Sequence, residues 1–144
     1  MTSAMRRLHA RLPARERYPL PPREIVDSAA APPDEAAKAI TVAAHFAYGA
    51  ACGALLAAAD PRMSRTGGAL AGTAIWLGSY MGWIPALGFL SSATAHPLRR
   101  DALMISVHVV WGTATAAAMR ELSEAHETIF AAGPDRDAPG RSRP

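Results

Sequence analysis

Residues 39–59, AITVAAHFAYGAACGALLAAA, contain no Asp, Glu, Lys or Arg, and this stretch decides the fold class. Residues 66–98 and 102–119 are equally free of charge, although the 144-residue chain carries 15 Lys plus Arg and 12 Asp plus Glu. A helix needs about 20 mainly apolar residues to cross a hydrocarbon core about 30 Å thick. Each stretch is long enough, the third only just. We therefore expect an all-α integral membrane helical bundle with three transmembrane helices, short loops and polar tails.

The alternative is a soluble helical bundle with an alanine-rich core. Ten of the residues in 39–59 are alanine, so this stretch is only moderately hydrophobic. Surface helices of soluble proteins, however, keep a charged face. None of the three stretches has one, which favours the membrane bundle.

The chain divides into three regions. Residues 1–35 are basic and proline-rich, and residues 36–122 form the expected transmembrane domain, with spans at about 39–59, 67–90 and 102–119. Residues 123–144 are a polar tail that we expect to be disordered.

Local signals divide the flanking segments further. Residues 19–22 (PLPP) are not expected to form regular helix, because proline disrupts helix interiors. Residues 24–31 could form a short surface helix that ends at Pro32. Pro85 is expected to kink or end the second span, and residues 91–101 are expected to form a loop.

Several classes of function are disfavoured. The arginines are spread among acidic residues, so the net charge of +3 does not predict a nucleic-acid partner. The single cysteine, Cys52, excludes an intrachain disulfide. The chain lacks a Gly-rich phosphate loop, Gly-x-Ser-x-Gly and His-Glu-x-x-His, so we do not expect an enzyme. The N-terminal region and the second loop together hold nine basic residues, whereas the first loop and the tail hold six. This difference favours a cytoplasmic N-terminus.

One motif occurs in both the first and the third span. Residues 45–49 (HFAYG) and 108–112 (HVVWG) both read His-x-x-aromatic-Gly, 63 residues apart. Each histidine lies six residues past the start of its uncharged stretch, and the two spans run in the same direction. We therefore predict that His45 and His108 lie about 9 Å below the same membrane surface and can face one another.

An ionisable side chain inside a bilayer is costly and marks a candidate functional site. With Tyr48 and Trp111, which share their helix faces, His45 and His108 form a candidate intramembrane polar site. Paired imidazoles could bind a haem or a metal ion, or transfer protons. The structural alternative is that each neutral histidine hydrogen-bonds a neighbouring helix while its glycine lets the backbones approach. No carboxylate or second cysteine accompanies the pair in sequence, so we predict neither a metal site nor a cofactor.

Glycines at four-residue spacing indicate close helix packing. The candidate packing glycines are Gly49, Gly53, Gly68, Gly72, Gly78, Gly82 and Gly112. Six of them form Gly-x-x-x-Gly pairs, which permit close helix crossing within the chain or between copies.

Aromatic residues recur at helical spacing in the second span, at Trp76, Tyr80 and Trp83. A quinone or haem could stack on this stripe, but packing and anchoring at the membrane surface are commoner uses of such residues. The remaining histidines, His9, His96 and His126, lie in polar stretches, and we expect them to be solvated.

Four of these motifs together resemble a known family. They are residues 19–25 (PLPPREI), His45-x-x-Tyr48-Gly49, the Gly-rich second span ending in Trp83-Ile84-Pro85, and His108-x-x-Trp111-Gly112. Over about residues 1–122 the chain is similar to small, uncharacterised bacterial inner-membrane proteins of the YagU type. The resemblance implies a helical fold in the bacterial inner membrane and implies no activity. Such proteins carry a further hydrophobic helix before the proline stretch, so either this chain lacks that helix or its start lies further upstream.

The sequence therefore predicts a multi-pass inner-membrane protein whose partners are the lipid bilayer and either further copies of itself or another membrane subunit. The leading hypothesis for its role is a non-enzymatic structural or accessory subunit that self-associates. The alternative is an oligomeric protein that uses the two histidines for transport or for binding a cofactor, a metal ion or protons.

Overall fold

The computed structural model describes residues 2–130, and within that range the chain is helical and contains no strand. The predicted all-α class is confirmed. The elements are α1 (Thr2–His9), η1 (Ala14–Glu16), α2 (Pro21–Ala30), α3 (Asp34–Ala59), α4 (Arg65–Gly78), η2 (Ser79–Trp83), α5 (Ile84–Ala86), η3 (Ala93–Ala95) and α6 (Leu98–Thr128). The tail predicted to be disordered begins at residue 123, but residues 123–128 form the end of α6. Residues 131–144 lie outside the described residues.

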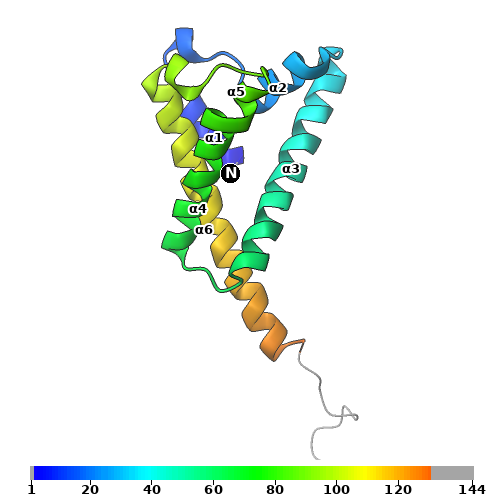
Figure 1. Cartoon of the computed structure of the whole chain (residues 1–144), viewed down its shortest axis with the longest axis vertical. Coiled ribbons are helices and arrows are strands. Elements are labelled where there is room, and N and C mark those ends of the chain that lie inside the picture. The colour runs from blue at the N-terminus through cyan, green and yellow to red at the C-terminus, as the bar shows by residue number, and fades with distance from the viewer. Residues whose placement is uncertain (1, 131–144) are drawn as a thin grey trace, which may run out of the picture.

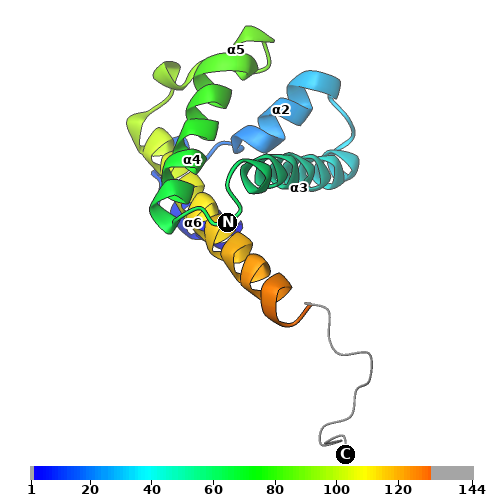
Figure 2. The ribbon, with the colours of Figure 1, turned by 60° about the horizontal axis from the view of Figure 1, so that its bottom comes forward.

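Three long helical segments are arranged as a tight pair and a separate arm. In Figure 1, α4 lies along α6, whereas α3 leans away from both and packs mainly against α2. Seen from another side, α3 again stands apart from α4 and α6 (Figure 2). The chain turns from α3 to α4 at residues 60–64, at the end opposite α2 and α5.

The α4–α6 pair is tight because glycines let its backbones touch. A Cβ on Gly68 would overlap the carbonyl oxygen of Gly112, and a Cβ on Gly72 would overlap that of His108. The buried Ala116 continues the small-residue face of α6. α4 and α6 are therefore the most closely packed pair of helices among the described residues.

The predicted second span is helical from Arg65 to Ala86 but changes character on the way. After α4, the five residues of η2 form a π-helical turn, in which Gly82 has φ −114° and ψ −106°. Pro85 then lies inside the short α5, and the helix ends after Ala86. A proline removes a helical hydrogen bond and crowds the carbonyl four residues earlier, so its distortion falls in the preceding turn, where the π-turn lies. The kink and end of the helix expected at Pro85 are confirmed.

Among residues 2–130, two helices, α3 and α6, are long and apolar enough to cross a membrane by length and composition. They contain 26 and 31 residues, and their most apolar windows have mean hydropathies of 1.6 and 1.5. The 14 residues of α4 are too few to cross alone.

The proline-rich segment contains more helix than expected. Pro21 and Pro22 are the first two residues of α2 rather than part of an irregular stretch. Proline is favoured at the first turn of a helix, where its missing N–H has no partner to lose. α2 ends at Ala30, and Ala31 adopts a left-handed conformation with φ 39° before the next prolines.

The stretch expected to be a loop, residues 91–101, also holds structure. It contains η3 and the start of α6 at Leu98. Arg100 is 1% exposed, and its guanidinium lies 3.6 Å from the ring centroid of Tyr18. It also donates to Glu24 at 2.9 Å and to the backbone oxygen of Pro19. Arg100 therefore attaches the N-terminal segment to the start of α6.

His96 joins this cluster, so its predicted solvation is wrong. Its Nδ1 lies 3.0 Å from the hydroxyl of Tyr18, and its ring centroid lies 5.6 Å from that of Tyr80. Its Nε2 is buried and has no hydrogen-bond partner among the described residues. The polar residues next to His96 in the chain do not predict the burial of this atom. It depends on contacts with residues far away in the chain.

Candidate functional site: an apolar crevice lined by both histidines

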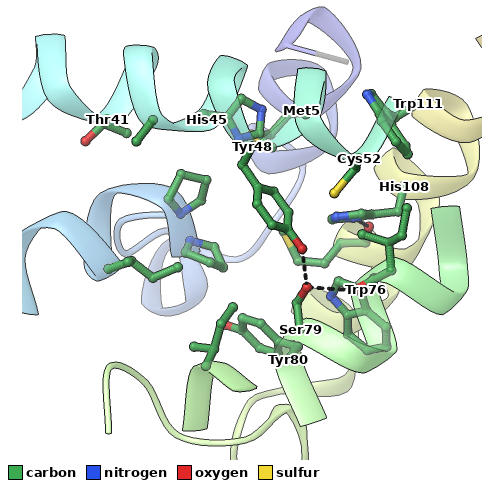
Figure 3. Close-up of a pocket in the computed structure, with 18 of the residues that line it drawn as sticks. Met5, Thr41, His45, Tyr48, Cys52, Trp76, Ser79, Tyr80, His108 and Trp111 are labelled. Atoms are coloured by element: carbon green, nitrogen blue, oxygen red, sulfur yellow. Dashed lines mark hydrogen bonds between the residues drawn. The ribbon is translucent and has the colours of Figure 1, made fainter. Parts of the chain in front are cut away.

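A crevice of about 210 Å³ lies between the α3 arm and the α4–α6 pair. α3 forms one wall, η2 and the end of α4 form the opposite wall, and α6 contributes Met104, His108 and Trp111. Pro21, Pro22 and other residues of α2 line it at one end. Figure 3 shows side chains from these helices pointing into the same space.

Close contacts between α3 and α6 bound the crevice at the end away from α2. A Cβ on Gly49 would lie 3.8 Å from Nε1 of Trp111, and one on Gly53 would lie 3.7 Å from the Thr115 side chain. These are ordinary van der Waals distances, looser than the backbone contacts of α4 with α6. The arm therefore touches α6 lightly here and separates from it toward α2 (Figure 1).

The structure brings all four predicted polar-site residues, His45, Tyr48, His108 and Trp111, to this one crevice. Gly112, by contrast, turns toward α4. No hydrogen bond joins the two imidazoles, and Tyr48 lies between the labelled histidines in Figure 3. Over residues 2–130, no group of three or more His, Cys, Asp or Glu side chains is placed to hold a metal ion.

His108 has a defined tautomer. Its Nδ1 lies 2.7 Å from the backbone oxygen of Met104, one turn earlier in α6. A carbonyl oxygen only accepts, so Nδ1 carries the proton and Nε2 of the neutral ring is an acceptor. The hydrogen bond is thus within α6, rather than to a neighbouring helix. His45 makes no hydrogen bond to the described residues, although its ring packs edge-on against Phe46 at 6.2 Å.

Tyr48 is held by a serine that the sequence analysis did not single out. The hydroxyl of Ser79 donates to the backbone oxygen of Ile75 at 2.7 Å. Its oxygen also lies 2.8 Å from the Tyr48 hydroxyl and 3.3 Å from Nε1 of Trp83. Since the single Ser79 proton is used, Tyr48 and Trp83 donate to Ser79. This network crosses the crevice from α3 to η2.

All three residues of the aromatic stripe in the second span line the crevice, but they differ in burial. Trp76 and Tyr80 are buried, with ring centroids 5.9 Å apart, and they belong to the main apolar cluster with Leu103 and Val107. Trp83 is more exposed, and its ring centroid lies 6.1 Å from that of Tyr48. The π-turn shifts the helical register, so the Trp83 side chain does not join the apolar cluster as those of Trp76 and Tyr80 do.

The seven predicted packing glycines have three different environments. Gly68, Gly72 and Gly112 lie at the backbone contact of α4 with α6, and Gly49 and Gly53 face α6 from α3. Gly78 and Gly82 have open space where a Cβ would stand, with no described atom within 4 Å.

The sequence patterns described above did not indicate a role for Arg100 or Tyr18. One signal was available: Arg100 lies three, four and seven residues before the apolar Leu103, Met104 and Val107. That spacing places it on the buried face of α6, whereas the adjacent Arg99 is exposed.

Comparison with known proteins gives no match to any protein-family model, any curated protein or any solved structure. The resemblance to YagU-type proteins therefore stays a prediction from the short motifs.

Proposed function

We propose that this chain is an integral protein of the bacterial inner membrane with three crossings. These are α3, the continuous segment α4–η2–α5, and α6. In this proposal it is a non-enzymatic structural or accessory subunit that self-associates.

The exposed surface of α3 carries the proposal. Val42 and Phe46 on one side of the helix and Leu55 on the other are 57%, 64% and 72% exposed, and residues 39–59 bear no charge. Burying such a side chain is worth about 1.5–3 kcal/mol, so exposing these side chains to water would be costly. Lipid removes that cost, because hydrocarbon solvates the same side chains.

The length of the second segment and the placement of charge support the crossing count. As a straight α-helix, residues 65–86 would extend about 33 Å, which is close to the thickness of a hydrocarbon core. The kink at Gly82 makes the actual path shorter than this. Arg62 pairs with Glu127 at one end of the molecule. Arg23, Asp34 and Lys38 form ion pairs at the opposite end.

Labelling of single cysteines tests the topology. In a Cys52→Ser background, cysteine is introduced at Ser64, Thr128, Ser28 or Ser91, and sealed membrane vesicles are treated with an impermeant maleimide. We expect Ser64 and Thr128 to react from one side and Ser28 and Ser91 from the other. Labelling of Ser64 and Ser91 from the same side would contradict three crossings. Leu55→Cys, on the proposed lipid-facing surface, is the unreactive control.

The open space at Gly78 and Gly82 supports self-association. Leu77 and Met81, which directly precede these glycines in the chain, and Leu70, eight residues before Gly78, are exposed apolar side chains. Small residues flanked by large ones permit close approach between helices in lipid.

Crosslinking in native membranes, with Gly78 and Gly82 both changed to isoleucine, tests this contact. We expect a crosslinked dimer or higher oligomer from the unchanged protein and a loss of that species from the variant. A monomer in both samples would exclude self-association.

A second candidate function is a cofactor, metal or proton site, and the shared crevice of His45 and His108 favours it. Visible absorption and metal analysis of protein purified from membranes would test this function. A colourless, metal-free sample in which replacing either histidine only lowers stability would assign both residues a structural role.

A further inference from the structure

The crevice is mainly apolar but is also lined by polar side chains, among them His45, Tyr48 and His108, and its chemistry restricts what can occupy it. Proline and aliphatic residues of α2 separate it from the charged end of the molecule. Under the proposed membrane location, on which this inference rests, a ligand would enter sideways from the bilayer between α3 and the α4–α6 pair.

The size of the crevice suits a substituted ring. An engineered apolar cavity of about 150 Å³ binds benzene. At about 210 Å³ this crevice has room for a ring and several substituents. A longer hydrocarbon tail would extend through the open side.

The walls suit a flat ring. Tyr48 of α3 and Trp83 of η2 approach each other from opposite walls, with ring centroids 6.1 Å apart, and Trp111 lines the space from α6. Aromatic rings pack favourably in offset or edge-to-face arrangements. A saturated acyl chain would gain less from these walls than an aromatic ring.

The hydrogen bonds set the polarity of the ligand. Nε2 of neutral His108 is an acceptor, because the Nδ1 proton is bound to the oxygen of Met104. The Tyr48 proton is donated to Ser79, which leaves the Tyr48 oxygen as an acceptor too. Two neighbouring helices therefore present acceptors to the same space.

The lining residues Trp76 and Tyr80 add donors, because Nε1 of Trp76 and the Tyr80 hydroxyl are buried without a partner among the described residues. A hydroxyl group suits this set, since it can donate to an acceptor and accept from a donor.

We propose that the crevice binds a lipid-soluble aromatic alcohol, an alkylated phenol or hydroquinone, whose O–H donates to Nε2 of His108. The ring lies between Tyr48, Trp83 and Trp111, and the alkyl tail extends into the bilayer. The proposal concerns binding and includes no redox step.

Binding of three matched probes to the full chain in detergent micelles tests this proposal. The probes are decylhydroquinone, held reduced without oxygen, its oxidised quinone, and its dimethyl ether. Quenching of tryptophan fluorescence reports occupancy, since Trp76, Trp83 and Trp111 all line the crevice. We expect the hydroquinone to bind at least about tenfold more tightly than either analogue, because both lack the hydroxyl donor.

Replacement of the acceptor provides the second arm. His108→Leu is expected to bind all three probes with similar affinity, whereas His126→Leu, on the exposed end of α6, should keep the discrimination. If His108→Leu does not fold, the three-probe comparison on the unchanged protein still decides the question.

Equal affinity of the unchanged protein for all three probes, or no binding of any, would overturn the proposal. The proposal would also be overturned if the crevice held co-purified phospholipid and none of the three probes displaced it. These outcomes leave the cysteine-labelling result untouched, so a failure of this inference can be told apart from a failure of the proposed topology.

Discussion

Gly68 of α4 and Gly112 of α6 meet backbone to backbone, and each occupies the place where the other's Cβ would lie. This contact joins two segments 44 residues apart in the chain. The rest of the molecule is arranged around it: α3 leans on this pair, and the crevice lies between them.

Gly112→Ala should destabilise the protein by about 1–3 kcal/mol or more. The added methyl would meet the backbone of α4, which cannot move aside as a flexible side chain can. Thermal unfolding in detergent, followed by circular dichroism, measures the loss. Gly78→Ala is the matched control, because the space beside Gly78 is open, and it should leave stability unchanged or higher. Equal effects of the two changes would contradict the packing described.

Arg100→Gln should loosen the N-terminal segment and cost about 3 kcal/mol of stability. The change removes the buried charge that holds Tyr18 and Glu24 against α6. Faster cleavage by trypsin within residues 11–23 would report the release. Arg99→Gln, at an exposed neighbouring position, should be silent. A segment that remains protected in Arg100→Gln would show that Arg100 does not hold it.

The free energy of unfolding should fall at alkaline pH as Tyr18 loses its proton. Burial raises the pKa of its hydroxyl above the ordinary value of 10.0, although the positive charge of Arg100 opposes the shift. The unfolded chain therefore releases this proton first. The stability that Tyr18 contributes is full below its unfolded pKa and is lost as pH rises through the folded pKa.

Unfolding measured across alkaline pH should show this decline, and Tyr18→Phe should flatten it. The same slope in both proteins would assign the decline to other groups.

Tyr48→Phe should reduce stability by about 0.5–1.5 kcal/mol. It removes the donor that links α3 to Ser79 across the crevice, while the ring and its contact with Trp83 remain. Thermal unfolding measures the effect, and the emission of Trp83 should shift as α3 moves. Phe46→Leu, on the exposed surface of α3, is a control that should change neither. An unchanged Tyr48→Phe protein would mean that the hydroxyl contact contributes nothing.

The sequence by itself determined the helical class and the positions of the long helices. Uninterrupted uncharged stretches have a length and periodicity that local chemistry can reveal, and α3 and α6 coincide with two of them. It also indicated that His45 and His108 occupy equivalent positions on parallel helices. That inference needed only the helical rise and the repeated motif.

Only the tertiary structure decided which side chains meet. The direction of the α3 arm depends on its contacts with α2 and α6, so the crevice between α3 and η2 has no counterpart in any local pattern. The π-turn at residues 79–83 changes the facing of Trp83, which shifts the helical register that a regular period assumes. Arg100 is buried and His96 is partly buried because Tyr18, some eighty residues earlier, folds onto them. Hydropathy describes each residue with its neighbours in the chain, whereas burial depends on neighbours in space.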